Sequence, residues 1–160
     1  MNDRLWQKNV LYEWYAEGLK RKDDYFMRFI NHWIALNWLY SKEYEGNPRL
    51  TEIEAIRAFC DNQRYMQAFA NYNPFENEHV AVLKKQAIYD MRSGKLATKT
   101  WIKLKENDVK ALFETLYRIR CNLFHGSKSL RNDRDIELVR ASANILEGYL
   151  AELVQIVLPE

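Results

Sequence analysis

The chain has 160 residues, of which 48% are apolar and 14% aromatic, with only five glycines and three prolines. This length and composition predict one helix-rich domain, spanning residues 1–160, with a full hydrophobic core. The formal net charge of +2 excludes the strong overall basicity of many nucleic-acid-binding proteins, so binding of that kind would require a local basic patch.

The N-terminal part of the chain predicts two long helices. Apolar residues at helical spacing indicate a helix over 5–19, with Gly18 near its end. Asp23 or Asp24 can cap a second helix, whose apolar and aromatic residues continue to Tyr40. The wide aromatic face of this second helix predicts a central position in the fold.

Shorter elements are expected in the middle of the chain. After a break that contains Gly and Pro, Thr51 and Glu54 form the capping-box pattern that begins a short third helix. A second break at 71–74 precedes the segment 76–91, which can form a further helix. The segment 93–106 has weak periodicity, and we interpret it as a loop or a short extended piece.

The clearest helix begins after Asn107 or Asp108 as N-cap and stops at Gly126. The last helix begins near Asp133 and keeps an uninterrupted three-four apolar repeat to Val157. Without internal repeats or linkers, the expected fold is an all-α, single-domain bundle of about five helices. The apolar stripe of the penultimate helix consists of Val109, Leu112, Phe113, Leu116, Ile119 and Leu123.

The end of the penultimate helix carries an unusual set of side chains. At about 100° per residue, Arg120 falls within the apolar stripe, where a charge is costly unless it is paired or the stripe opens on a cleft or second subunit. The side chains opposite the stripe are Arg118, Cys121, Asn122 and His125. Two interpretations stay open, a solvated helix end or a functional site.

Simpler explanations exist for several of these side chains. A histidine near a helix C-terminus interacts favourably with the helix dipole, and Arg118 is by default a solvated arginine of a helix surface. Packing explains Cys121 better than nucleophilic catalysis. Because His32 and His79 occur singly, a metal site built on histidines is not expected, and no cofactor is implied.

Other functional classes lack their motifs. The sequence has no Gly-rich phosphate loop, no G-x-S-x-G elbow and no H-E-x-x-H. Cys60 and Cys121 lack metal or redox spacing, which suits a reducing cytosol. No segment approaches the roughly 20 apolar residues of a membrane span, and the charged N-terminus lacks the apolar core of a signal peptide. We therefore expect a cytoplasmic protein without membrane contact.

The segment RCNLFHG, residues 120–126, resembles the R-x4-6-H signature of the HEPN superfamily, whose helical bundles include many metal-independent endoribonucleases of toxin–antitoxin, phage-defence and CRISPR systems. In addition, WIALNWLY resembles the early aromatic helix of that family, and GSKSLRNDRDIELVRASANIL resembles the segment that follows the motif in one bacterial branch. The resemblance implies that Arg120 and His125 are the motif residues, with Arg118 in reserve at a permitted spacing.

The chemistry of RNA cleavage is compatible with these residues. RNA supplies its own nucleophile, the 2′-OH, so cleavage needs a proton-transfer group and a cation for the developing phosphorane charge. His125 can transfer the proton, Arg120 can hold the phosphate, and Asn122 can orient the phosphate or the imidazole. No metal is required. A local basic cluster is expected to bind RNA phosphates and consists of Arg118, Lys128, Arg131 and Arg134.

The spacing of the motif also bears on assembly. Residues five apart on a helix differ by about 140°, so Arg120 and His125 of one chain cannot easily flank one phosphate. The resemblance implies a homodimer in which Arg120 of one chain approaches His125 of the other across a two-fold axis. We expect the segment 118–128 in the interface of this dimer. The alternative is a non-catalytic HEPN module that binds RNA, a nucleotide or a protein partner. The expected partners of the protein are RNA, a second copy of the chain, and a cognate antitoxin or other protein. Cys121, at a position that is often polar in the family, favours this alternative.

Overall fold

The computed structural model describes residues 3–91, 101–126 and 131–158. Within them, a two-stranded antiparallel sheet joins β1 (Ile88–Tyr89) to β2 (Trp101–Ile102), and a 3-10 helix, η1 (Pro74–Glu76), precedes α5. The expected all-α, single-domain fold is confirmed, with seven α-helices in this part of the chain rather than about five. They are α1 (Asp3–Leu19), α2 (Tyr25–Gly46), α3 (Glu52–Cys60), α4 (Gln63–Asn71), α5 (Glu78–Lys84), α6 (Val109–Phe124) and α7 (Asp133–Val157).

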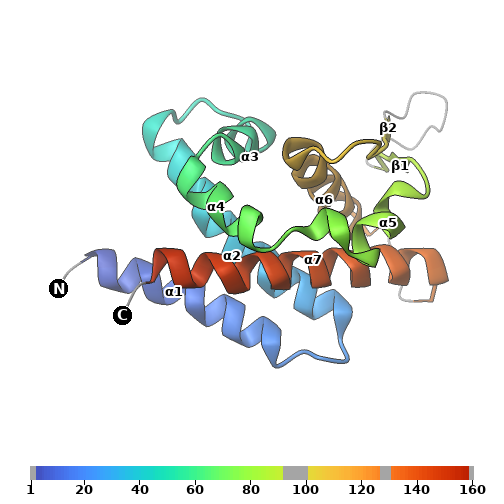
Figure 1. The fold of residues 1–160 in the computed structure, drawn as a ribbon, viewed down its shortest axis with the longest axis horizontal. Coiled ribbons are helices and arrows are strands. Elements are labelled where there is room, and N and C mark those ends of the chain that lie inside the picture. The colour runs from blue at the N-terminus through green and yellow to red at the C-terminus, as the bar shows by residue number, and fades with distance from the viewer. Residues whose placement is uncertain (1–2, 92–100, 127–130, 159–160) are drawn as a thin grey trace.

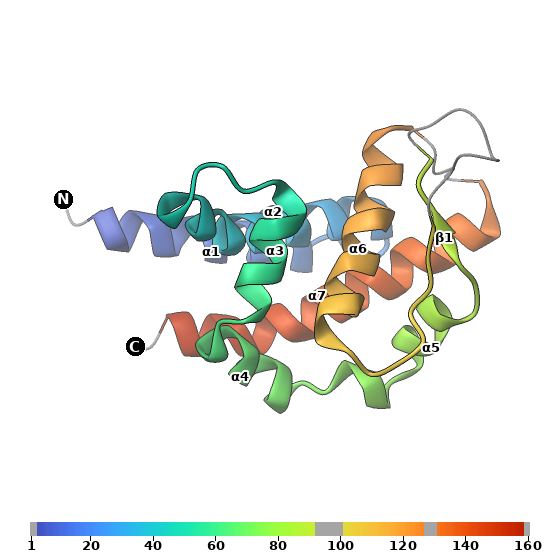
Figure 2. The same cartoon turned by 90° about the horizontal axis from the view of Figure 1, so that it is seen from above.

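The long helices α1, α2 and α7 run along one another and form the base of the fold (Figure 1). The side of α2 and α7 that faces away from α1 carries α3, α6 and the β1–β2 pair (Figure 1). There, α3 and α6 lie side by side and cross the long helices (Figure 2). Helix α2 contacts α1, α3 and α7, so its predicted central position is confirmed. This arrangement places the C-terminal end of α6 next to the β1–β2 pair.

An aromatic cluster joins four helices at the centre of the core. Phe113 of α6 lies 5.7 Å from the rings of Phe59 on α3 and Phe69 on α4, and 5.5 Å from Tyr149 on α7. Three of these rings are essentially inaccessible to solvent, and Phe69 is nearly so. Because such rings bury a large apolar area in specific edge and tilted contacts, this cluster fixes α6 on the base of the fold.

The caps predicted from sequence are confirmed. The Asp24 carboxylate accepts a hydrogen bond from Met27 N at 3.0 Å, and Thr51 and Glu54 form the reciprocal capping box at the start of α3. Asp108 caps α6 by accepting from Ala111 N at 2.9 Å. Gly126 has a φ of 69°, the left-handed conformation that glycine adopts readily after a helix C-terminus.

The middle of the chain differs from the sequence prediction. The segment 76–91 is not one helix, because α5 ends at Lys84 and the chain then forms β1, whose pairing with β2 overrides local helical preference. Helix α4 was not predicted, and α2 continues six residues beyond Tyr40. Of the segment 93–106, residues 93–100 lie outside the described residues, and Trp101–Ile102 is the expected extended piece.

Candidate functional site

The predicted motif occupies the last turn and a half of α6, which ends at Phe124 with His125 as its C-cap. The backbone N–H of His125 donates to the carbonyl of Cys121, and the side chain is exposed. Among the described residues, no hydrogen-bond or ion-pair partner holds the imidazole. Within the part of the chain that the structure describes, the His125 side chain is therefore open to solvent.

Arg120 is half-buried, and its guanidinium is packed among aromatic rings. Its Cζ lies 5.0 Å from the ring centre of Phe124, 5.8 Å from that of Trp33 and 5.9 Å from that of Tyr117. Contacts of this kind stabilise a partly desolvated cation. The sequence prediction that Arg120 faces the apolar side of α6 is consistent with these contacts.

The charge of Arg120 is paired within the chain. Its Nη1 donates to Glu52 Oε2 on α3 at 3.0 Å, and the other oxygen of Glu52 accepts from the Tyr40 hydroxyl at 2.6 Å. Burial lowers the pKa of Arg120, but the carboxylate of Glu52, with Cys121 and Tyr40, raises this pKa by more, so the arginine stays charged. Burial, followed by the hydrogen bond to Glu52, raises the pKa of Tyr40, which keeps its proton as the donor.

The three guanidinium nitrogens of Arg120 differ in what they contact. Nη1 is bonded to Glu52, and Nε is buried without a hydrogen-bond partner among the described residues. Nη2 donates to no described residue and is not among the buried nitrogens that lack a hydrogen-bond partner. Because Nη1 is bonded to Glu52 and Nε is buried, Nη2 is the nitrogen with which Arg120 can contact a further acceptor.

The sequence predicts that Asn122 orients phosphate or the imidazole, but its side chain contacts the backbone around β1 instead. Its side chain is 1% exposed, and both ends of its amide are used by the backbone around β1. Nδ2 donates to the Tyr89 carbonyl at 2.7 Å, and Oδ1 accepts from Met91 N at 3.0 Å. Asn122 therefore holds the β1 strand against α6 and has no free polar group in this arrangement.

The predicted basic cluster is also distributed differently. Arg118 is not a solvated arginine, because its side chain is largely buried in an ion pair with Asp90, directly after β1. Arg134 donates from Nη2 to the Ala87 carbonyl at 3.0 Å, before β1. Arg131 is exposed, and Lys128 lies outside the described residues. Two of these arginines thus anchor the segment around β1.

The structure shows three features that the sequence does not predict. Glu52 and Tyr40 support Arg120, and the surface next to the motif carries the exposed aromatic pair Tyr89 and Trp101. Glu52 follows the predicted N-cap Thr51, but nothing in the sequence connects that helix start with Arg120. The short strands gave no alternating pattern long enough to predict their pairing.

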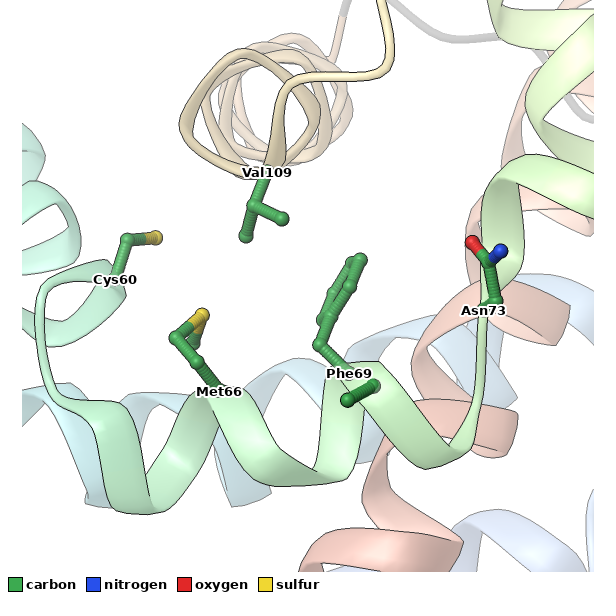
Figure 3. A pocket seen from close by; sticks show the side chains of 6 residues that line it. Cys60, Met66, Phe69, Asn73 and Val109 are labelled. Carbon is green, nitrogen blue, oxygen red and sulfur yellow. The ribbon is translucent and has the colours of Figure 1, made fainter.

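A mainly apolar pocket of about 390 Å³ lies at the opposite end of α6 from the motif. Figure 3 shows Cys60, Met66, Phe69 and Val109 pointing toward one another around it. Burial raises the pKa of the Cys60 thiol to about 12, so this thiol is not an activated nucleophile. The pocket is separate from the candidate site, because it lies at the other end of α6. None of its lining side chains is charged, so it offers no group that could bind a phosphate by ion pairing.

Neither a metal-binding group nor a membrane-spanning helix is found among the residues that the structure describes. These residues contain no group of three or more His, Cys, Asp and Glu side chains placed to hold a metal ion. None of the described helices is both long and apolar enough to cross a membrane. No protein-family model matches the chain, and no curated protein or solved structure matches it either.

Proposed function

We propose that this chain is a HEPN-like, metal-independent endoribonuclease in which His125 transfers protons and Arg120 binds the scissile phosphate. The observation that carries the proposal is the arrangement at the end of α6. An exposed imidazole lies on the same last turns as a guanidinium that Glu52 holds through one nitrogen and that leaves Nη2 without a described partner.

In the proposed reaction, the 2′-oxygen of RNA attacks the adjacent phosphorus and the bond from phosphorus to the 5′-oxygen breaks. The proton of the 2′-OH passes to a base, and the leaving 5′-oxygen receives a proton from an acid, so that the products end in a 2′,3′-cyclic phosphate and a 5′-OH. His125 serves as one of these groups, and Arg120 stabilises the negative charge of the phosphorane. Glu52 acts through Arg120 as a positioning residue.

We propose a homodimer with the segment 118–128 in its interface. Of the two arguments for a dimer, the charge of Arg120 in the apolar stripe and the spacing of the motif, only the spacing still applies. Arg120 already has an intrachain partner in Glu52, so its charge does not require a second subunit. The separation of about 140° between Arg120 and His125 around the helix still favours a site shared by two chains. Light scattering tests this assembly, and a monomer at the concentrations of the cleavage assay contradicts it.

A second candidate is a non-catalytic HEPN-like module that binds RNA, a nucleotide or a protein partner. The ion pair between Arg120 and Glu52 favours it, because a purely structural arginine would be held in the same way. The buried Cys121 beside Arg120 is compatible with this alternative. The cytoplasmic toxin–antitoxin or phage-defence setting, with a cognate antitoxin as partner, belongs to the first proposal.

The deciding experiment is cleavage of labelled RNA by the purified protein in EDTA. We expect cleavage with cyclic-phosphate ends, and a loss of about 100-fold or more in His125→Ala, since general acid–base catalysis contributes at least that much. His79→Ala is the matched control, because this histidine lies on α5 and outside the motif. Equal activity in wild type and His125→Ala, or dependence on added Mg²⁺, contradicts the mechanism.

The role of Arg120 is separated from stability with a second pair of variants. Glu52→Gln removes the ionic partner of Arg120, and Arg57→Ala removes another ion pair between α3 and α6, which Arg57 Nε forms with Glu114 at 2.6 Å. If Glu52 positions Arg120 for phosphate, only Glu52→Gln lowers kcat and shifts the salt dependence of cleavage. If both variants lower only the melting temperature, Arg120 has a structural role and the non-catalytic candidate is favoured.

A further inference from the structure

The outer face of the β1–β2 pair presents two aromatic side chains to solvent. Tyr89 and Trp101 are directly opposite each other in the antiparallel ladder and are 40% and 57% exposed. Directly opposite residues project from the same face of a sheet. The neighbouring pair, Ile88 and Ile102, projects from the other face and is buried or half-buried. The two rings therefore form an exposed aromatic surface.

Positive charge continues this surface along the chain after β2. From Trp101 to Lys105 burial alternates, so that Ile102 and Leu104 are covered while Lys103 and Lys105 are exposed. Neither lysine forms an ion pair with a described residue, and the nearest acidic residue along this segment is Glu106, directly after Lys105. One side of this short segment thus carries an aromatic ring followed by two exposed lysines that have no ion-pair partner in the described part of the chain.

The exposed surface formed by Tyr89, Trp101, Lys103 and Lys105 is held beside the motif through the segment around β1. Asn122 bonds the backbone on both sides of Asp90 through its two amide ends, and Arg118 pairs with the Asp90 carboxylate. All three contacts come from the last two turns of α6, within seven residues of His125. Two polar residues of the motif region therefore position this surface relative to the candidate catalytic histidine.

We propose that Tyr89, Trp101, Lys103 and Lys105 form a binding surface for single-stranded RNA, with bases stacked on the two rings and phosphates held by the lysines. Aromatic side chains interleaved with positive charge are the general means of binding single strands without sequence preference. A protein partner is less well matched, because lysine is depleted at the centre of protein–protein interfaces. The assignment of this RNA as substrate rests on the proposed function, whereas the binding surface itself does not.

The test measures the anisotropy of a fluorescein-labelled single-stranded RNA of mixed sequence in EDTA, with every variant in a His125→Ala background so that the RNA stays intact. We expect Trp101→Ala and Tyr89→Ala each to raise Kd about tenfold, the loss of one stacked base. Tyr12→Ala is the matched control, since Tyr12 is 53% exposed on α1, and it should leave Kd unchanged.

The lysines have their own readout in the salt dependence. Replacing both Lys103 and Lys105 by alanine should reduce the slope of log Kd against log salt by about 1.4, or about 0.7 for each lost phosphate contact. The exposed Lys22, before α2, supplies a control alanine variant that should keep the slope. An unchanged slope in the double variant, together with an unchanged Kd in Trp101→Ala, overturns the proposal.

The remaining outcomes separate this inference from the nuclease proposal. RNA binding that Trp101→Ala weakens, in a protein that cleaves nothing, supports the surface and rejects the nuclease. Cleavage whose KM is the same in wild type and Trp101→Ala, together with an unchanged Kd in the anisotropy assay, supports the nuclease and overturns the surface. Self-association that Trp101→Ala abolishes without any change in RNA affinity identifies a protein interface, which also overturns the proposal.

Discussion

His32 of α2 makes the stability of this protein depend on pH in a specific way. The imidazole is fully buried, and neither ring nitrogen makes a well-formed hydrogen bond with a described residue. Burial, and then the positive charge of Arg28, lower the pKa of His32 to about 4, and weaker backbone contacts at Ala143 and Tyr15 offset only part of this shift. The folded protein therefore holds His32 neutral at physiological pH.

The size and sign of the effect follow from linkage. The ordinary pKa of about 6.5 applies to the unfolded chain, so as the pH falls the unfolded state takes up a proton before the folded state does. This one group should lower the free energy of unfolding by about 2 kcal/mol between pH 7 and pH 5, and by about 3 kcal/mol at pH 4. This contribution of His32 to the free energy of unfolding is present above the unfolded pKa of about 6.5. It is lost as the pH falls from there toward the folded pKa of about 4.

Urea unfolding at pH 7, 6 and 5 measures this loss, because carboxylates with ordinary pKa values titrate mainly below that range. The comparison variant is His32→Gln, which has no titrating side chain at that position. Whatever its absolute stability, the variant should lose about 2 kcal/mol less than wild type between pH 7 and pH 5. Equal pH dependence in the two proteins would refute the reasoning.

Three further predictions concern packing. A Cβ at Gly18 would lie 2.3 Å from the buried imidazole on α2, so Gly18→Ala should cost about 1–3 kcal/mol by urea unfolding, whereas Gly46→Ala, with nothing within 4 Å, should change stability by less than about 1 kcal/mol. Phe113→Ala removes the shared ring of the four-helix cluster and should cost about 3–5 kcal/mol; a loss below about 1 kcal/mol would contradict that packing. Cys60 and Cys121 are free and buried, so a thiol reagent near pH 7 should modify both only in denaturant, and rapid modification of the native protein would show that they are accessible.

Local sequence determined most of the helical framework. Asp24, Thr51 and Asp108 cap the helices that follow them because a short side-chain oxygen can reach the backbone N–H groups two or three residues on, a contact that depends on no other part of the fold. Gly126 ends α6 for an equally local reason. Helix α4 and the β1–β2 pair were missed, because short elements derive their stability from the neighbours they contact.

The candidate site was predictable in part. The pattern of α6 predicts Arg120 on the apolar side of the helix and Cys121 and Asn122 on the opposite side. Because a charge within an apolar stripe is costly when unpaired, it also indicates that Arg120 needs a partner. That partner is Glu52, 68 positions away in the chain, and no local pattern indicates it. The RNA-cleaving role of Arg120 and His125 stays a proposal that the cleavage assay tests.

The tertiary structure decided what covers the second side of α6. Periodicity reports which residues of one helix share a face, but the element that packs on that face is set by the path of the rest of the chain. The segment around β1 covers Asn122 and pairs its Asp90 with Arg118, which converts two expected site residues into supports for the exposed pair of Tyr89 and Trp101. The sequence determined a polar end of α6. Only the packing of distant segments determined that, of the polar side chains there, His125 alone is open to solvent without a described partner. The reason is that burial and pairing depend on contacts between residues that are far apart in the chain.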